Sequence, residues 1–176
     1  MRPERFLPCG RLVNKAREGA IIHMKVLIAT EGSDFSNAAI RKFCEMFSGK
    51  RELFVKVVSV VQPALVPSAP FAIASSFVDQ IDKFAVTHAR SVVDRAAEEI
   101  ERALPFAEEV RKDVITGTPE QSIIEEAEAW KADLIVTGSH GHGFLKRAWL
   151  GSVSNAVVHR APCSVLIIRK DGTPRY

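Results

Sequence analysis

Five short segments that carry apolar or β-branched residues divide this chain, and stretches of helical periodicity separate them. They span residues 25–30, 52–61, 108–116, 133–138 and 164–170. Each is too short for a buried helix, so we expect a strand in every one. Strands that alternate with amphipathic helices form a mostly parallel sheet covered on both faces. The sequence therefore predicts a single α/β domain whose ligand site lies beyond the carboxyl ends of the strands.

The first two predicted helices differ in length. Ser33 or Asp34 can cap a helix that ends at Gly49. A longer helix begins at Phe77, ends near residue 105, and carries an apolar stripe at three- and four-residue spacing. His88 lies on this stripe with no second metal ligand in sight, which favours a histidine at the edge of the core over a metal site.

The third helix has the clearest start signal. Thr118 is the predicted N-cap, Pro119 suits the first helical position, and Gln121 would complete a capping box. A short helix over residues 152–160 is stopped by Pro162. These signals place one helix before the fourth predicted strand and another after the loop that follows this strand.

Composition excludes several functional classes. The chain has 176 residues, is 47% hydrophobic and has a net charge of +3, which is too mild to indicate a nucleic-acid or acidic-membrane partner. No apolar run reaches the roughly 18 residues of a membrane span. Cys9, Cys44 and Cys163 lack metal-type spacing and indicate free thiols in a reducing compartment, which we expect to be the cytoplasm.

The two ends stand apart from the predicted domain, which covers residues 24–170. Residues 1–23 are basic at the start and have no long apolar region, so they are a poor signal peptide. We expect Met24 to be the natural start and residues 1–23 to be a leader; the alternative is a genuine N-terminal arm. Residues 171–176 form a short C-terminal tail.

The loop after the fourth strand carries the strongest functional pattern. Gly138 ends the strand, Gly141 follows, and Gly151 precedes the last helix. Glycine allows close backbone approach and adopts positive φ without strain. The start of a helix offers unpaired N–H groups and a positive dipole end, which together favour a phosphate.

Side chains in the same loop could add to an anion site. Ser152 and Ser154 can donate hydroxyl hydrogen bonds. The cationic candidates that could screen phosphate charge are His140, His142, Lys146 and Arg147. The alternative interpretation is a glycine turn, a serine N-cap and a solvated basic loop, because the P-loop and dinucleotide-binding patterns are both absent.

The glycine spacing matches a known motif. Gly138, two residues, Gly141, nine residues, Gly151 and Ser152 fit the G-2x-G-9x-G-[S/T] pattern of the ATP-binding universal stress proteins. The flanking segments "ADLIVTGSHG", "LGSVSNAVVHRAPCSVLII" and "GTPEQSI" are also similar to that family. The chain thus resembles a UspA-like universal stress protein from about Met24 to Lys170.

The resemblance implies a Rossmann-like, adenine nucleotide alpha hydrolase-like fold with a five-stranded parallel sheet in the order 3-2-1-4-5. It implies ATP at the strand ends, with Mg²⁺ held through the phosphates, and a homodimer paired through the last strand, Val165 to Ile168. For the nucleoside, the matching positions are Ala29, Thr30 and Glu31, with Val55, to within one or two residues, contacting adenine through its backbone. Around ribose and phosphates they are Thr137, Gly138, Gly141, Gly151, Ser152, Val153 and Ser154.

One position departs from the family. Glu31 stands where the family usually has aspartate. The extra methylene moves the carboxylate by about 1 Å and could weaken nucleoside binding by roughly 1 kcal/mol. The alternative role of Glu31 is to cap the following turn.

Two functions remain open at this point. The first is a regulatory protein whose nucleotide occupancy reports energy or stress state. The second is a slow ATPase or phosphoryl-transfer enzyme, which would need metal-holding carboxylates or a positioned base. The glycine loop contains no acidic residue and no Walker lysine, and paired loop histidines are usually only solvated. An adenylyl-forming enzyme is disfavoured because "TEGSDFS" has one glycine where that loop needs two. We therefore assign no catalytic or metal-ligating residue.

Overall fold

The computed structural model describes residues 23–63, 75–141 and 150–169, with side chains in the long helix from residue 80 onward. Strands and helices alternate along these residues. In chain order they are β1 (Met24–Ala29), α1 (Asp34–Phe47), β2 (Leu53–Val61), α2 (Ser75–Ala103), β3 (Glu109–Thr116), α3 (Pro119–Trp130), β4 (Leu134–Gly138), α4 (Ser152–Arg160) and β5 (Ser164–Ile168).

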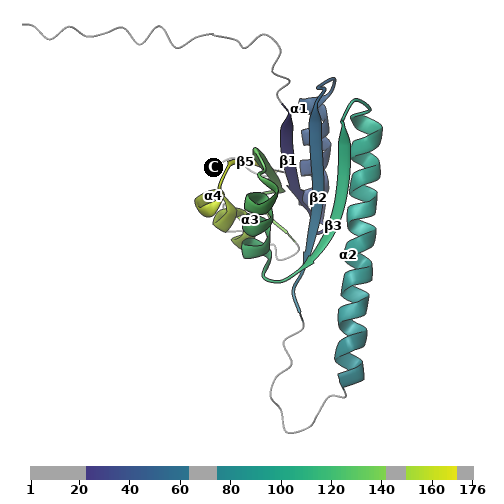
Figure 1. Cartoon of the computed structure of the whole chain (residues 1–176). Helices are drawn as coiled ribbons and strands as arrows, with labels where there is room; N and C mark the ends of the chain where they lie inside the picture. Colours follow the sequence, from purple (N-terminus) through teal and green to yellow (C-terminus); the bar gives the residue numbers. More distant parts are fainter. Residues whose placement is uncertain (1–22, 64–74, 142–149, 170–176) are drawn as a thin grey trace, which may run out of the picture.

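The five strands form one parallel sheet in the order β3-β2-β1-β4-β5 (Figure 1). The central strand is β1, where Val26 is in register with Val55 of β2 and with Leu134 of β4. The predicted strand order and fold class are therefore confirmed. The strand order reverses between β1 and β4, because β2 and β3 are added on one side of β1 and β4 and β5 on the other. Such a switch point is where parallel sheets bind ligands.

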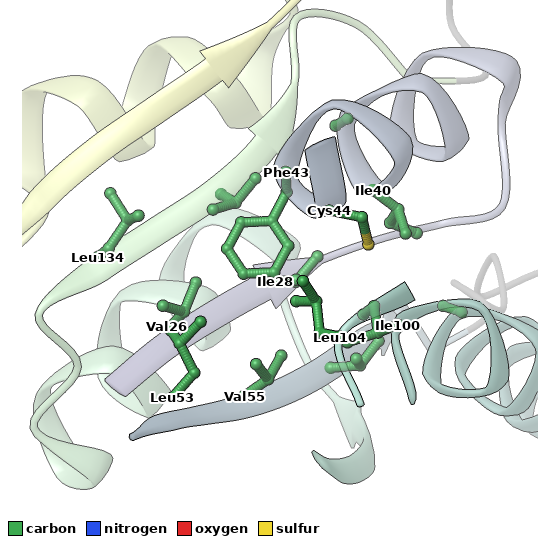
Figure 2. Packing of buried hydrophobic residues seen from close by; sticks show 14 of the residues in the cluster. Val26, Ile28, Ile40, Phe43, Cys44, Leu53, Val55, Ile100, Leu104 and Leu134 are labelled. Carbon is green, nitrogen blue, oxygen red and sulfur yellow. The ribbon is translucent and has the colours of Figure 1, made fainter. Parts of the chain in front are cut away.

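Alternate residues of each strand feed two separate cores. Val26 and Ile28 of β1 point toward α1 and α2, where they pack with Ile40, Phe43 and Ile100 (Figure 2). The intervening Leu27 and Ala29 point to the other face, against α3 and α4, in a second cluster that includes Ile123, Ala127 and Val157. Because both faces of the sheet are covered, residues at both alternating positions of a central strand such as β1 are apolar.

Of the two residues predicted to cap the start of α1, one is the N-cap in the structure. Ser33 is the N-cap, and its hydroxyl oxygen accepts a hydrogen bond from the backbone N–H of Ser36 at 3.3 Å. Asp34 is the first helical residue, where its charge complements the helix dipole. This geometry places the first turn of α1 directly above the end of β1.

The helix α2 is longer than the sheet that it covers. Its 29 residues span about 43 Å at 1.5 Å per residue, whereas the strands beside it have eight or nine residues. In Figure 1 its N-terminal half runs past the ends of the strands. Consequently Phe84 is 74% exposed and burial begins at Ala89. His88 is exposed, so its predicted place at the edge of the core is wrong; the predicted start of the stripe, Phe77, lies outside the described side chains.

The start of α3 agrees with the prediction in position but not in chemistry. Thr118 is the N-cap and Pro119 the first helical residue, yet the Thr118 side chain makes no capping hydrogen bond. Gln121 turns to other partners: its amide nitrogen donates to Glu125 at 2.5 Å, and its amide oxygen accepts from Arg160. The predicted capping box is therefore wrong, because Gln121 ties α3 to α4 instead.

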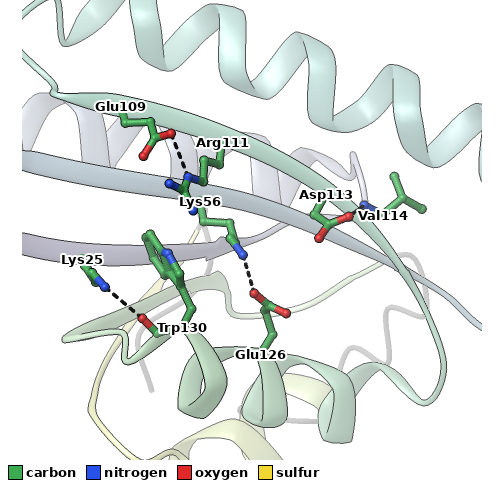
Figure 3. Close-up of polar contacts among 8 residues, drawn as sticks. All are labelled: Lys25, Lys56, Glu109, Arg111, Asp113, Val114, Glu126 and Trp130. Atoms are coloured by element: carbon green, nitrogen blue, oxygen red, sulfur yellow. Dashed lines mark hydrogen bonds and ion pairs between the residues drawn. The ribbon is translucent and has the colours of Figure 1, made fainter.

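An ion pair and an aromatic ring hold α3 against the sheet. Lys56 of β2 lies 2.6 Å from the carboxylate of Glu126, and both side chains are largely buried (Figure 3). The ammonium groups of Lys25 and Lys56 lie 5.6 and 5.4 Å from the centroid of the Trp130 ring, close enough for cation–π attraction. These contacts fix the helix whose first turns border the carboxyl ends of the strands.

Among the described elements, no helix combines the length and the apolar character that a membrane crossing requires.

Candidate functional site

A cavity of about 480 Å³ lies at the carboxyl ends of β1, β2 and β4. That volume is within the usual range for small-molecule and cofactor sites. Of the residues predicted for the site, those that line it are Ala29, Thr30, Glu31, Thr137, Gly138, His140, Gly141, Gly151, Ser152, Val153 and Ser154. Val55 does not line it, and His142 lies outside the described residues.

The end of β1 is locked by hydrogen bonds. The backbone N–H of Thr30 donates to the carbonyl of Val58 at 3.0 Å, and its hydroxyl donates to the Ser36 hydroxyl at 3.1 Å. The same Thr30 oxygen accepts from the N–H of Gly32 at 3.2 Å. Thr30 thus joins β1, β2 and α1 at one point and sets where the next residue, Glu31, enters the cavity wall.

The first motif glycine is required by its contact with α1. A Cβ atom on Gly138 would lie 2.9 Å from the carbonyl carbon of Phe35 and 3.0 Å from the nitrogen of Ser36. Real Cβ atoms do not approach backbone so closely, so a side chain would have to push α1 away. Gly138 therefore permits the close approach between β4 and α1.

Positive φ does not explain the motif. Gly151 has a φ of −67°, and neither Gly138 nor Gly141 has a φ in the left-handed region. Positive φ was one of the two reasons expected for these glycines, and it is wrong for all three. For Gly138 the structure supports a packing reason, because a Cβ atom there would meet the backbone of α1.

The carbonyl of Ser139 organises the entry into α4. It accepts from the N–H of Gly151 at 2.8 Å and from the hydroxyl of Ser154 at 2.9 Å. The Ser154 hydroxyl is also within 3.0 Å of the Gly151 carbonyl, and the residue is 3% exposed. In this structure its hydroxyl proton points to the backbone, and donation from this hydroxyl to a phosphate stays a prediction. Ser152 is exposed, and its hydroxyl remains available.

The N-terminus of α4 opens into the cavity. Gly151 is the N-cap and, as a glycine, provides no side-chain cap. The first intrahelical bond runs from Asn155 N–H to the Gly151 carbonyl at 2.9 Å, so the N–H groups of Ser152 and Val153 have no partner within the helix. These groups and the positive end of the helix dipole make this wall suitable for an anion.

His140 is part of the wall and not a solvated loop residue. It is 9% exposed, its ring centroid lies 5.3 Å from that of Phe35, and its Nδ1 lies 3.2 Å from the Ser139 hydroxyl. The expectation that it is merely solvated is therefore wrong. The other cationic candidates, His142, Lys146 and Arg147, lie outside the described residues.

Glu31 faces the glycine loop across the cavity. A Cβ atom on Gly141 would lie 3.3 Å from Oε1 of Glu31 and 3.5 Å from its Cδ. Oε1 itself is buried. Among the residues described along this wall, Glu31 is the only carboxylate and none is lysine or arginine. No group of three or more potential metal ligands occurs in the described part of the chain.

On β2 the residues that line the cavity differ from Val55, the residue predicted to contact adenine, and that contact stays untested. Val55 is fully buried in the core beneath α1 and α2, in register with Val26 near the start of β1. Val58 and Val60 line the cavity instead. Val58 is the residue opposite Ala29, the last residue of β1, so counting the register back from the strand ends would have found it.

Two further lining residues, Pro119 and Ile123, come from the first turns of α3. Together with Val58 and Val60 they give the cavity an apolar part. The sequence signal for these residues was the helix start at Pro119, which directly follows β3 at the same edge of the sheet.

A comparison with known protein families shows to which family this chain is related. A family model described as the universal stress protein family matches residues 23–169. The chain belongs to the universal stress protein family. A universal stress protein of Methanocaldococcus jannaschii is 30% identical over 154 residues, covering 88% of this chain and 86% of that protein. One from Thermus aquaticus is 33% identical over 148 residues, covering 82% and 97%.

Solved structures of universal stress proteins share the fold. UspA from Lactobacillus plantarum superposes with a TM-score of 0.70 at 23% identity, over 84% of this chain and 98% of that one. A family member from Arabidopsis thaliana with AMP bound has a TM-score of 0.58 at 18% identity, over 85% and 93%. One from Archaeoglobus fulgidus in complex with dAMP has a TM-score of 0.57 at 20% identity, over 84% and 99%.

Proposed function

We propose that this universal stress protein binds an adenine nucleotide, ATP included, in the cavity at the strand ends, and that occupancy of the cavity regulates its interactions. The observation that carries the proposal is the cavity of about 480 Å³ into which the N-terminus of α4 opens. The AMP and dAMP held by two proteins of the same fold support this ligand class.

Each side of the cavity suits one part of a nucleotide. The phosphates would bind the N–H groups of Ser152 and Val153, with the Ser152 hydroxyl as a further donor. The base would lie against the apolar part formed by Val58, Val60 and Ile123. The ribose would lie near Glu31, at the end of β1. Any Mg²⁺ would be held through the phosphates, since the described wall offers one carboxylate.

The proposal extends to assembly through β5. Val165, Leu166 and Ile167 at this edge are half-buried in the single chain. The opposite edge strand, β3, presents exposed Arg111, Lys112 and Asp113, which is how natural sheets prevent edge-to-edge pairing. An apolar edge and a charged edge on one sheet favour a two-fold dimer in which two β5 strands pair.

A slow ATPase is the second candidate, and His140 is the observation that favours it. A buried imidazole in the cavity wall could move a proton at the phosphate end. Both candidates require adenine-nucleotide binding, so binding is the first quantity to measure. We also propose a cytoplasmic location, in keeping with the free thiols of Cys44 and Cys163.

Calorimetric titration of the full chain with ATP and Mg²⁺ tests the proposal. The expected result is one site per chain with a dissociation constant in the micromolar range. Native mass spectrometry of the freshly purified protein should show the mass of a bound nucleotide. Absence of both heat and thermal stabilisation at millimolar ATP would overturn the proposal.

A further inference from the structure

We propose that the side chain of Gln62 recognises the base of the bound nucleotide. Its amide oxygen accepts a hydrogen bond from the amino group of adenine, and its amide nitrogen donates one to the ring nitrogen beside that group. The inference rests on the proposed function, because it concerns the same cavity, and it adds the residue that determines base specificity. Its basis is the place of Gln62 among the residues that line the cavity.

The strand β2 continues past the end of β1, and this continuation forms part of the cavity wall. The last residue of β1, Ala29, is in register with Val58, whereas β2 remains paired with β3 as far as Val61. A further hydrogen bond, from the N–H of Gly117 to the Val61 carbonyl at 2.9 Å, holds the backbone at that point. Gln62 therefore follows a strand that is fixed up to its last residue.

Alternation along β2 directs Gln62 to the cavity. Val58, Val60 and Gln62 are successive alternate residues, and all three line the cavity. Successive side chains of a strand point to opposite faces, so these three share the face on which α3 packs. Pro63 follows, and a residue before proline is restricted to extended backbone. Gln62 thus keeps the alternation of the strand, although the strand itself ends at Val61.

Gln62 brings hydrogen-bonding groups to the apolar part of the cavity. The other described residues of this part are Val58, Val60, Pro119 and Ile123, and none of their side chains can form a hydrogen bond. A glutamine amide has one acceptor oxygen and a nitrogen with two donor hydrogens. Adenine presents an amino donor beside a ring-nitrogen acceptor, so the amide can bond to both at once, as glutamine does when it reads adenine in DNA. Because Gln62 is exposed, this contact lies at the mouth of the cavity.

The test compares AMP with purine riboside monophosphate, which differs from AMP in lacking the amino group. Calorimetric titration measures the binding of each ligand to three forms of the full chain, which are the wild type, Gln62→Leu and Gln80→Leu. Leucine is close to glutamine in size and removes both hydrogen-bonding groups. Gln80→Leu makes the same change at an exposed position of α2 that does not line the cavity, and it is the matched control.

The decisive quantity is the dissociation constant of purine riboside monophosphate divided by that of AMP. We expect Gln62→Leu to lower this ratio by about threefold to tenfold, the effect of one hydrogen bond, and Gln80→Leu to leave it within about twofold. A purely structural effect of the substitution would weaken both ligands by the same factor and would leave the ratio unchanged. Circular dichroism and thermal melting show whether each variant is folded.

The outcomes separate this inference from the proposed function. If both ligands bind and Gln62→Leu keeps the wild-type ratio, other groups recognise the base and the inference is wrong. An equal fall of the ratio in Gln80→Leu would also contradict it, because that residue does not line the cavity. If the wild type binds neither ligand, the proposed function itself fails, and base recognition by Gln62 fails with it.

Discussion

The backbones of Gly138 and Phe35 are in direct contact, and a single added Cβ atom would come within 2.9 Å of the Phe35 carbonyl carbon. The contact joins the end of β4 to the first turn of α1. Both elements border the cavity, so the packing of the fold and the shape of the site depend on the same pair of residues.

Replacing Gly138 by alanine should therefore destabilise the protein. The new methyl group meets backbone that cannot rotate away, and overpacking of this kind costs about 1–3 kcal/mol. Gly151→Ala is the matched control, because its Cβ would lie 3.4 Å from the nearest atom, an ordinary contact. Urea unfolding of both variants measures the difference. Equal stability of the two alanine variants would show that α1 yields freely at this contact.

Two ion pairs of equal length should differ in strength because they differ in burial. Lys56–Glu126 and Lys112–Asp94 both have N···O distances of 2.6 Å, but the first pair is 14% and 20% exposed and the second 50% and 49%. We expect Glu126→Gln to cost about 1–2 kcal/mol and Asp94→Asn less than about 0.5 kcal/mol. Double-mutant cycles by urea unfolding isolate each pair. Comparable coupling energies would mean that burial does not decide the strength of these pairs.

The thiol of Cys44 should make stability depend on alkaline pH. Burial, and secondarily the charge of Glu99, raise the pKa of Cys44 from 9.0 to about 11. A raised pKa favours the protonated thiol in the folded state. The contribution of this thiol to the free energy of unfolding is therefore complete below about pH 9 and is lost as pH rises toward 11. Relative to Cys44→Ala, the wild type should lose about 1 kcal/mol between about pH 8 and about pH 10. A constant difference between the two proteins over that range would contradict the assignment.

Proline substitutions should distinguish dimer formation through paired β5 strands from the packing of β5 within a single chain. The Ile168 carbonyl accepts from Ser139 N–H, so Ile168 and Leu166 direct their backbone groups toward β4, and Val165 and Ile167 direct theirs outward. Val165→Pro should give a folded monomer where the wild type sediments as a dimer, because it removes an outward donor. Leu166→Pro, the control, removes a donor within the sheet and should destabilise the monomer. A monomeric wild type at tens of micromolar would exclude the dimer.

Hydrolysis of ATP should be slow or absent, below roughly one turnover per minute, far under the rates typical of enzymes. The sequence of the glycine loop, residues 138–151, contains no aspartate or glutamate that could hold a metal ion or orient an attacking water. Phosphate release measured on the wild type and on His140→Ala tests this expectation. A turnover near one per second that His140→Ala abolishes would favour the enzyme over the regulatory protein.

Local sequence patterns predicted the sheet because burial and strand periodicity are local properties. The apolar runs that contain Ile28 and Val136 have no polar residue within them, and both residues are fully buried. The glycine spacing likewise identified the loop at the cavity. Both signals depend on short stretches of chain and need no knowledge of the neighbouring elements.

The sequence was least informative where an element distant in the chain determines the position or partner of a residue. The apolar stripe on α2 predicts a buried face, but it does not reveal where the sheet beneath the helix ends. Phe84 and His88 precede the buried part of the helix and are exposed. The choice between Val55 and Val58 depends on register with β1, which the sequence of β2 alone does not contain. Gln121 was expected to cap its own helix, but Arg160, 39 residues away, provides a competing partner.

The two hydrogen bonds to the Ser139 carbonyl have an evolutionary consequence. They bring residues 139 and 151 together at the base of the loop, whatever lies between them. With its ends fixed by the scaffold, such a loop can change in length at little cost, since each doubling adds only about 0.6 kcal/mol of closure entropy. By this entropy argument the stability of the sheet imposes little constraint on the length of the loop, so selection for a fixed length would act through the ligand site.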